Sequence, residues 1–382
     1  MKKFLFRTAC FLLIQVGVGL LLLPPDRTEL KSGYMAALRD KVELVKTTPG
    51  SRVLFVGGSN VAFGVDSGYF ESALGRPAIN LGLHGALGLE FYLRVAEEHA
   101  RPGDIIVLLP EYSMLRGQLE PNERLIRMLL RQHPGAARYV DWKNFCDEVA
   151  LSEAAFWTQL AIKQISLEHD PHESLVREMK EHKRNSQIVM KRLARELLSF
   201  REKHGDHGKT PIPMKNLRAI ANSKIKRKHG VYRRSDFNDR GDMVGHHHLG
   251  SKLTAKKIRP VGAVQIEKLE RVADRLNAFA RACRTKGVTL YLSYSPLPQP
   301  AFKGSRRALS HLHRNLKELL DIPIVNSPET LVFPQGEFYD SMAHLTLAGK
   351  KKRSRILLEG LVRHLPAGLA PQQASRKQKA RQ

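Results

Sequence analysis

Three short, almost continuous apolar runs constrain the fold of this chain more than any other feature. They are "RVLFVGGS" (52–59), "PAINLGLH" (77–84) and "GDIIVLLPEY" (103–112). Strands of a parallel sheet that is covered on both faces have this uniform apolar character. A helical pattern such as 86–100 separates the runs. Because strands alternate with helices, the sequence predicts an α/β domain with an open parallel sheet.

The same alternation returns in the last third of the chain. A long helix is predicted over 263–285, followed by the apolar run 287–296. A second helix over 304–320 then leads to a short strand at 322–326, and a last helix covers 346–363. These elements are interpreted as the second part of the same sheet domain.

The N-terminal segment has the layout of an export signal. Basic residues precede the apolar run 9–23, and two prolines follow it. Fifteen residues span about 22 Å as a helix, which is short for a hydrocarbon core of about 30 Å. No small-residue cleavage site follows. We predict an uncleaved anchor in the inner (cytoplasmic) membrane with the body in the periplasm or outside the cell; a cleaved signal or a buried helix is the alternative.

The middle of the chain breaks the strand pattern. Its stretches are helical and very basic, and they contain no clear apolar strand. We therefore predict five segments along the chain: a signal-anchor helix at 1–25, the first part of the α/β domain at 26–120, a basic helical insertion at 121–260, the second part of the domain at 261–365, and a disordered tail at 366–382.

The charge balance favours acidic partners. The sequence has 63 Lys and Arg against 37 Asp and Glu, a formal net charge of +26. Such an excess attracts acidic glycans, phospholipid head groups or nucleic acid. Few aromatic residues are interleaved with the basic ones, which argues against nucleic acid. The three cysteines indicate neither a zinc site nor a disulfide framework, although one bridge between Cys146 and Cys283 stays open.

Ser59 follows the first predicted strand. In an open parallel sheet, ligands bind beyond the carboxyl ends of the strands. Gly57 and Gly58 let the backbone turn sharply there, and amides at the start of a helix face a developing negative charge. This position suits a serine nucleophile, and it equally suits a serine that only caps the next helix.

The stretch "FYDSMAHL" (338–345) supplies partners for such a serine. Asp340 and His344 stand just before the last helix. His344 can act as a general base toward Ser59, and Asp340 can fix the tautomer of its ring. For an isolated Asp and His in a loop, helix capping or a surface contact is the plainer interpretation.

Taken together, these motifs resemble the SGNH (GDSL-type) hydrolase superfamily, in particular its membrane-anchored bacterial branch related to cell-envelope O-acyl transfer. "VGGSN" (56–60) resembles the first block, "INLGLHGA" (79–86) the second and "FYDSMAHL" the last. "DFNDRGDMVGHH" (236–247) is similar to a phrase of the anchored branch and is expected to border the site. The resemblance implies a flavodoxin-like, three-layer α/β/α fold.

The resemblance also implies residue roles. Ser59 would be the nucleophile of an esterase or O-acyltransferase, His344 its base, and Asp340 the residue that orients His344. The amides of Ser59 and Gly85 would form the oxyanion hole, and no cofactor would be needed. The implied substrate is an acyl group on an envelope glycan or lipid, and the positive charge would fit an acidic polymer.

Two departures stand beside this resemblance. Asp340 and His344 are four residues apart, whereas the usual spacing is three. The asparagine expected after the third strand is missing, and Glu111 and Tyr112 stand there; loss of one oxyanion donor costs about 10²–10³ in rate. Two other asparagines are candidates to replace that donor, namely Asn60 and Asn238.

The departures motivate an alternative function, a non-catalytic scaffold that binds an acidic polymer or a partner protein.

Other features receive plainer interpretations. His84 is expected to pack in the core or at the surface. The histidine run 246–248 is interpreted as a loop without a metal, because adjacent histidines rarely face one centre and no further ligands complete a site.

Overall fold

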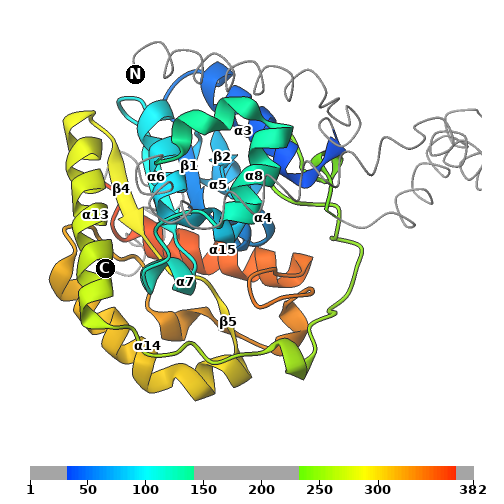
Figure 1. Ribbon diagram of the computed structural model, residues 1–382, viewed down its shortest axis with the longest axis vertical. Coiled ribbons are helices and arrows are strands. Elements are labelled where there is room, and N and C mark those ends of the chain that lie inside the picture. Colours follow the sequence, from blue (N-terminus) through cyan, green and yellow to red (C-terminus); the bar gives the residue numbers. More distant parts are fainter. Residues whose placement is uncertain (1–31, 142–231, 367–382) are drawn as a thin grey trace, which may run out of the picture. The chain divides into compact units, whose positions relative to one another are not determined.

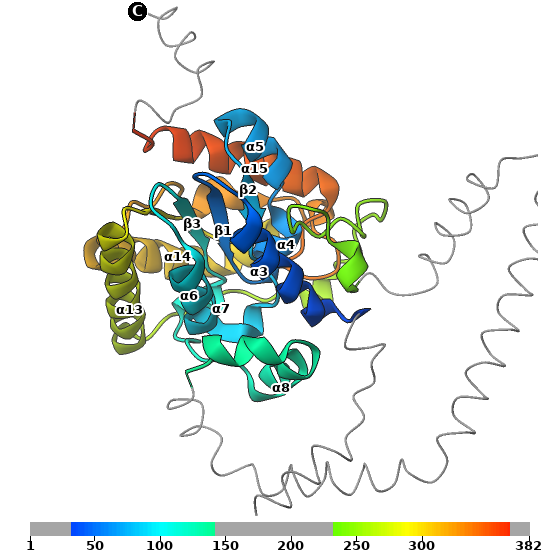
Figure 2. The same ribbon diagram turned by 90° about the horizontal axis from the view of Figure 1, so that it is seen from above.

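Figures 1 and 2 show the computed structural model, which describes residues 32–141 and 232–366. The expected anchor at 1–25 and the tail lie outside these residues. Among the helices that are described, none has the length and apolar character needed to cross a membrane.

A parallel sheet forms the centre of the fold, as the apolar runs predict. Across the sheet its strands are β2 (Ala78–Asn80), β1 (Val53–Gly57), β3 (Ile105–Leu109) and β4 (Thr289–Leu292). The run predicted as a strand at 322–326 contributes only one parallel bridge, between Ile324 and Leu292. A second, two-stranded parallel sheet joins β5 (Leu297–Pro298) to β6 (Val332–Phe333). The predicted α/β class with a parallel sheet is confirmed.

The strand order changes direction at β1. The chain passes from β1 to β2 on one side and then returns to β3 on the other side of β1. Open α/β sheets bind ligands beyond the carboxyl ends of the strands at such a switch in order. Ser59 and Glu111 each stand two residues beyond the end of β1 and β3. The topology therefore brings these two residues to the position where a ligand is expected.

Helices cover both faces of the sheet (Figure 2). One face carries α3 (Ala37–Thr47), α6 (Gly88–His99) and α13 (Ile266–Thr285), and the other carries α5 (Ser67–Leu74) and α15 (Leu347–Val362). Phe55 and Val107 of the strands pack with Leu357 and Leu361 of α15. Burying each such side chain stabilises the fold by about 1.5–3 kcal/mol. This arrangement is compatible with three layers.

The remaining elements are short apart from α14 and α8. They are η1 (Tyr34–Ala36), α4 (Ser59–Gly64), η2 (Gly85–Leu87), α7 (Tyr112–Leu115), α8 (Glu123–Gln132), η3 (Pro134–Tyr139), η4 (Arg234–Asp236), η5 (Ala255–Lys257), α14 (Gln299–Leu319), η6 (Pro328–Leu331) and η7 (Gln335–Glu337). Local signals set several ends. The Asp66 carboxylate accepts the Tyr69 N–H at the start of α5, and Gly75, with φ of 63°, ends that helix.

The chain divides into two compact units, Met1–Phe145 with Val231–Gln382 and Cys146–Gly230. Both ends of the insertion predicted over 121–260 therefore belong to the unit that holds the sheet. The first end contains α8 and η3. The second end, from residue 232 onward, contains the 3-10 turns η4 and η5.

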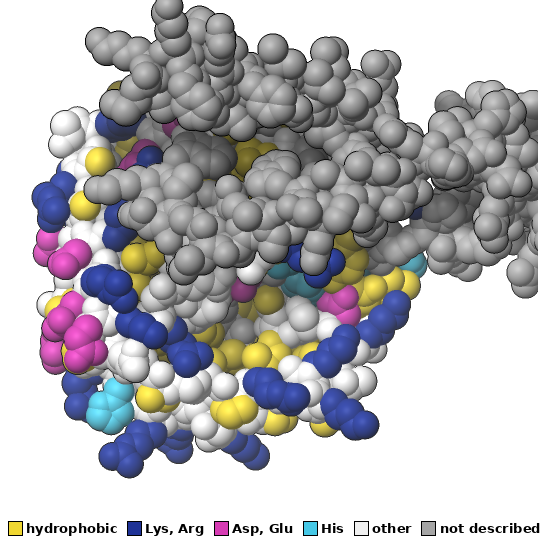
Figure 3. Space-filling view, in the orientation of Figure 1, with side chains coloured by type: hydrophobic (Ala, Val, Ile, Leu, Met, Phe, Trp, Pro, Cys, Tyr) yellow, Lys and Arg dark blue, Asp and Glu magenta, His cyan; other side chains and the backbone are white. Residues whose placement is uncertain are grey.

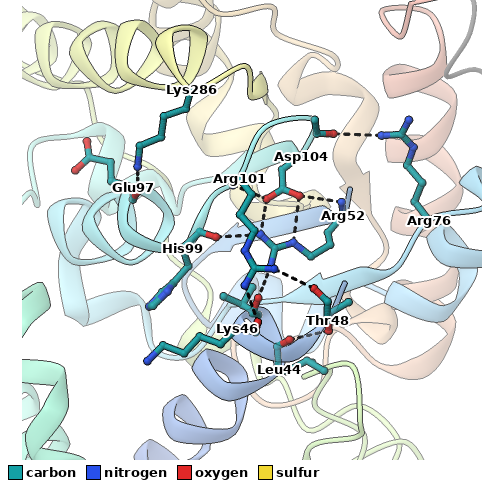
Figure 4. Close-up of polar contacts among 12 residues, drawn as sticks. Leu44, Lys46, Thr48, Arg52, Arg76, Glu97, His99, Arg101, Asp104 and Lys286 are labelled. Atoms are coloured by element: carbon teal, nitrogen blue, oxygen red, sulfur yellow. Dashed lines mark hydrogen bonds and ion pairs between the residues drawn. The ribbon is translucent and has the colours of Figure 1, made fainter. Parts of the chain in front are cut away.

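A closed polar cluster lies at the amino ends of β1 and β3 (Figure 4). The Arg52 guanidinium bonds both carboxylate oxygens of Asp104, at 3.1 Å from Nε and 2.5 Å from Nη2. Both side chains are fully buried. Arg52 also donates to the carbonyls of Val45 and His99, and Asp104 accepts the N–H of Arg101. This network ties α3 and α6 to the two strands.

Candidate active site

Ser59 is the first residue of α4, directly after β1 and Gly58. Its hydroxyl donates to Glu111 Oε1 at 3.1 Å, and the main-chain N–H of Asn60 reaches the same oxygen at 3.4 Å. Gly58 holds the N-cap position of α4, which has no side-chain cap. The side chain of Ser59 therefore bonds Glu111 and does not cap the helix.

The Glu111 carboxylate fills the space between the two glycine-containing turns of the site. A Cβ added to Gly85 would lie 2.1 Å from Glu111 Oε2, and one added to Gly58 would lie 2.4 Å from Oε1. Real Cβ atoms do not approach so closely, so glycine is required at both positions while the carboxylate is there. The carboxylate thus stands beside Gly85, where the resemblance leads us to expect an oxyanion.

Asp340 and His344 form a hydrogen-bonded pair across a tight turn. His344 Nδ1 lies 2.7 Å from Asp340 Oδ1. The turn is closed by an antiparallel bridge between Phe338 and Leu345 and by the Tyr339 N–H, which donates to the carbonyl of His344 at 2.7 Å. The additional residue relative to the usual spacing is absorbed in this turn, and the carboxylate still meets the ring.

Tyr232 contacts both residues of this pair, and the sequence did not indicate it. Its hydroxyl donates to Asp340 Oδ2 and lies 3.1 Å from His344 Nδ1. Burial alone would raise the pKa of Asp340, but the hydrogen bonds from His344 and Tyr232 outweigh it and hold this pKa below its ordinary value. Asp340 is therefore kept as a carboxylate that orients the ring of His344.

Phe63 brings this pair to the serine helix. The ring of His344 stacks on Phe63, with centroids 3.9 Å apart and planes within 13°. Phe63 stands four residues after Ser59 in α4, so both lie on one side of that helix. Among the described residues, Ser59 and His344 form no direct hydrogen bond, and His344 Nε2 has no hydrogen-bond partner.

His246 supports the same turn from the segment 236–247. Its Nε2 lies 2.8 Å from the carbonyl of Leu345, and its ring packs 4.8 Å from that of Phe63. Burial lowers the pKa of His246 to about 3, so the ring is neutral and Nε2–H donates.

In the part of the chain that the structure describes, no group of three or more His, Cys, Asp or Glu side chains could hold a metal ion.

His84 is half-buried at the start of η2 and belongs to the surroundings of the site. Its Nδ1 accepts the N–H of Ala86 at 3.1 Å, which leaves the proton of the neutral ring on Nε2. Burial lowers the pKa of His84, while the charges of Glu111 and His344 raise and lower it respectively. His84 is thus an electrostatic neighbour of both residues.

The other predicted residues point elsewhere. The side-chain amide of Asn60 is buried and donates to Ser295 Oγ at 2.6 Å and to the carbonyl of Leu109 at 3.0 Å. Asn238 accepts the N–H of Asp242 at 2.8 Å and bonds within its own turn. Tyr112 is buried, which raises the pKa of its hydroxyl. Neither asparagine side chain bonds Glu111, whereas the main-chain N–H of Asn60 reaches its Oε1 at 3.4 Å.

Comparisons with known protein families and curated proteins identify no relative of this chain. A search against protein-family models and against curated proteins finds no match to the sequence.

Cys283 is buried in α13 with a free thiol, and Cys146, with which the sequence left a bridge open, lies outside the described residues.

Proposed function

We propose that this chain is a serine-dependent esterase or O-acyltransferase with an SGNH-type, flavodoxin-like core. The observation that carries the proposal is the way in which His344 is held. Asp340 binds Nδ1, and the ring stacks on the helix that begins with Ser59. A carboxylate at Nδ1 selects the tautomer whose Nε2 can accept a proton from a serine hydroxyl.

The proposed reaction has two steps. Ser59 Oγ attacks the acyl carbonyl carbon, and its proton passes to His344 Nε2. The bond to the leaving alcohol then breaks, and His344 returns the proton to that oxygen. Water or a sugar hydroxyl attacks the acyl-serine in the second step, with His344 again taking and returning the proton. The amides of Ser59 and Gly85 hold the oxyanion, and Asp340 stays ionised throughout.

Glu111 gives the site a resting state. Its carboxylate accepts the hydroxyl of Ser59 and lies against Gly85, so an incoming carbonyl oxygen must displace it. The hydrogen bonds lost are worth about 1.5–3 kcal/mol each because their acceptor is charged, and substrate binding must offset them. Glu111 therefore acts as an occupant that leaves when the acyl group arrives.

The proposed substrate is an acyl group on an extracytoplasmic glycan or lipid. Two observations on the sequence support this choice: the N-terminal segment has the layout of an anchor, and the net charge of +26 attracts an acidic polymer. In this proposal the N-terminal helix holds the protein at the membrane, and nucleic acid is not a partner.

Pre-steady-state kinetics with a chromogenic acyl ester test the proposal. We expect a burst of one alcohol per chain, because the acyl-serine forms before it is released. Ser59→Ala abolishes the burst. Ser72→Ala is the matched control, since Ser72 is exposed on α5 and bonds only the carbonyl of Gly68. A burst that survives in Ser59→Ala would overturn the proposal.

A second candidate function is a scaffold that binds an acidic polymer or a partner protein. It is favoured by Glu111, whose negative charge lies beside Gly85 where an oxyanion would have to develop. In that case no acyl ester gives a burst, and Ser59→Ala binds an acidic polymer as tightly as the unchanged chain does.

A further inference from the structure

The outward side of α14 is cationic. Lys303, Arg307, Arg314 and Lys317 are exposed and follow one another at spacings of four, seven and three residues. These spacings place them on one side of the helix, opposite buried residues such as Leu309. No ion pair among the described residues includes any of the four.

This stripe destabilises the helix that carries it, because like charges three or four residues apart repel each other. The only acidic residue of α14 is Glu318, at its C-terminal end. Glu318 lies four residues after Arg314, the spacing of a helical ion pair, so the helix offers a neighbouring carboxylate to Arg314 only; an external anion would supply the countercharge for the rest of the stripe.

A basic segment connects the candidate active site to this stripe. Lys257 Nζ donates to the carbonyl of Asp340 at 3.1 Å. Four residues later, the N–H of Val261 donates to Ser305 Oγ of α14 at 2.6 Å. Arg259 is exposed between these two contacts, and Lys256 is exposed directly before the first. We call residues 252–259 together with the α14 stripe the cationic track.

Surface hollows lie along the track. One of about 460 Å³ lies at the start of α14, and its lining combines basic, polar and apolar side chains: Gln299, Phe302, Lys303, Arg306 and Val332. Another of about 220 Å³ lies towards the other end of the helix, where His313, Lys317 and Arg363 stand beside Asn326, Ser327 and Thr330. In Figure 3, Lys and Arg side chains gather along the lower margin, where Figure 1 shows α14.

We propose that the cationic track binds a linear acidic glycan and leads its acyl groups to Ser59. This inference rests on the proposed function and names its substrate class. The helix stripe alone extends over fifteen residues, whose fourteen rises of 1.5 Å span about 21 Å, so an extended polymer is needed to meet all of its charges. Carboxylate groups repeated along a glycan supply the complementary charge.

The same residues argue against a membrane surface as the occupant. A helix that lies in a lipid interface presents large apolar side chains beside its basic ones. The exposed large hydrophobic residues among those described are Tyr69, Met128, Tyr232 and Ile266, and none of them is on α14. The stripe has charge without the apolar residues that enter lipid.

The test compares two triple variants of the full chain, kept in a neutral detergent. The track variant is Lys303→Gln/Arg307→Gln/Arg314→Gln. The matched control is Arg271→Gln/Arg281→Gln/Arg284→Gln, which removes the same charge from exposed positions of α13. Binding to polygalacturonate is measured at low salt, with uncharged dextran as the second probe. We expect the track variant to weaken polygalacturonate binding at least about fivefold and the control to change it less than twofold.

Several outcomes would overturn the proposal. Equal weakening by the two variants would show that only bulk charge matters. Binding to dextran as tight as to polygalacturonate would show that the polymer's charge is not recognised. Tighter binding to anionic phospholipid vesicles, lost only in the track variant, would assign the track to a membrane. Lys303→Arg/Arg307→Lys/Arg314→Lys, which keeps the charge, should retain binding if the track variant fails through charge and not through misfolding.

Ser59→Ala is measured in parallel. It removes the acylation burst but leaves polygalacturonate binding intact, so a failure of the chemistry and a failure of the track are seen separately. If neither the unchanged chain nor Ser59→Ala binds polygalacturonate, the track proposal is wrong whatever the result of the burst experiment.

Discussion

Each end of the sheet carries a cluster of polar side chains. The two clusters differ in how many hydrogen bonds their side chains make and in how deeply they are buried. At the amino ends of β1 and β3, Arg52 and Asp104 are fully buried, and each bonds several neighbours as well as the other. At the carboxyl ends, Ser59 bonds only Glu111, and His344 is held on one ring nitrogen. The second cluster is also partly exposed, with 12% of the His344 side chain and 22% of the Asp340 side chain accessible.

Under the proposed function, this difference distinguishes a cluster that stabilises the fold from one that takes part in the reaction. A buried charge whose bonds are all made can only hold elements together, because any change of partner leaves a charge unsatisfied. A serine with one weak bond and an imidazole with a free nitrogen can exchange partners with a substrate. We therefore expect substitutions at the amino-end cluster to change stability and those at the carboxyl-end cluster to change reactivity.

The largest effect is expected for Asp340→Asn. The amide no longer holds His344 in the tautomer that accepts a proton, and the acylation rate should fall by about 10⁴. The free energy of unfolding should change by only about 1 kcal/mol. Burst kinetics and urea unfolding measure the two quantities, and Asp321→Asn, at an exposed position, is the control. A large loss of stability with little loss of rate would assign Asp340 to the structural class.

Asp104→Ala should show the opposite pattern. It leaves the Arg52 guanidinium buried without its carboxylate, and breaking a buried pair costs about 3–5 kcal/mol. Urea unfolding monitored by circular dichroism checks the loss. The control is Asp239→Ala, because 81% of the Asp239 side chain is exposed and a surface pair is worth about 0–1 kcal/mol. Equal losses in the two variants would remove the contrast between the two ends of the sheet.

Glu111→Gln tests how the charge of Glu111 affects the acylation rate within the carboxyl-end cluster. The amide keeps the size of the side chain but removes a negative charge from beside Gly85. Relief of a repulsion of about 1 kcal/mol, the value for two charges 4 Å apart in water, should raise the acylation rate about fivefold. A fall in rate would instead show that Glu111 takes the proton of Ser59.

The smallest effect is expected for Tyr232→Phe, and it depends on pH. The Tyr232 hydroxyl helps to lower the pKa of Asp340, so this bond stabilises the fold at pH values above about 4 and the stabilisation is lost as the pH falls through the pKa of the folded state. The difference in unfolding free energy between the unchanged chain and Tyr232→Phe should therefore be full at pH 6 and shrink below pH 4. Tyr69→Phe, with 40% exposure against 41% for Tyr232, should show no such dependence.

Much of the fold could be predicted because periodicity is local. The apolar runs at 52–59 and 103–112 became β1 and β3, since a buried parallel strand has an apolar pattern of its own. The segment 322–326, which was expected to form a strand, makes only one parallel bridge to β4. The length of strand pairing depends on the partner strand as well as on the segment's own residues. Residues 232–260, which the sequence assigned to the insertion, belong to the unit that holds the sheet and contain the short 3-10 turns η4 and η5.

The site was harder to predict because its members come from distant segments. Ser59 and His344 could be named from their positions at strand and helix ends. Tyr232 has no local signal, since only the folded chain brings it to Asp340. The orientation of Glu111 depends on the space that Gly85 leaves, and a single sequence does not encode such a distance in any periodic pattern.

The central claim is that Ser59 is a nucleophile that His344 activates. Labelling of the full chain with a fluorophosphonate, followed by peptide mapping, tests it most directly. We expect one adduct, on Ser59, formed at least about 10³ times more slowly in His344→Gln and at an unchanged rate in Ser72→Ala. An adduct on another residue, or on Ser59 at the same rate without the imidazole, would contradict it.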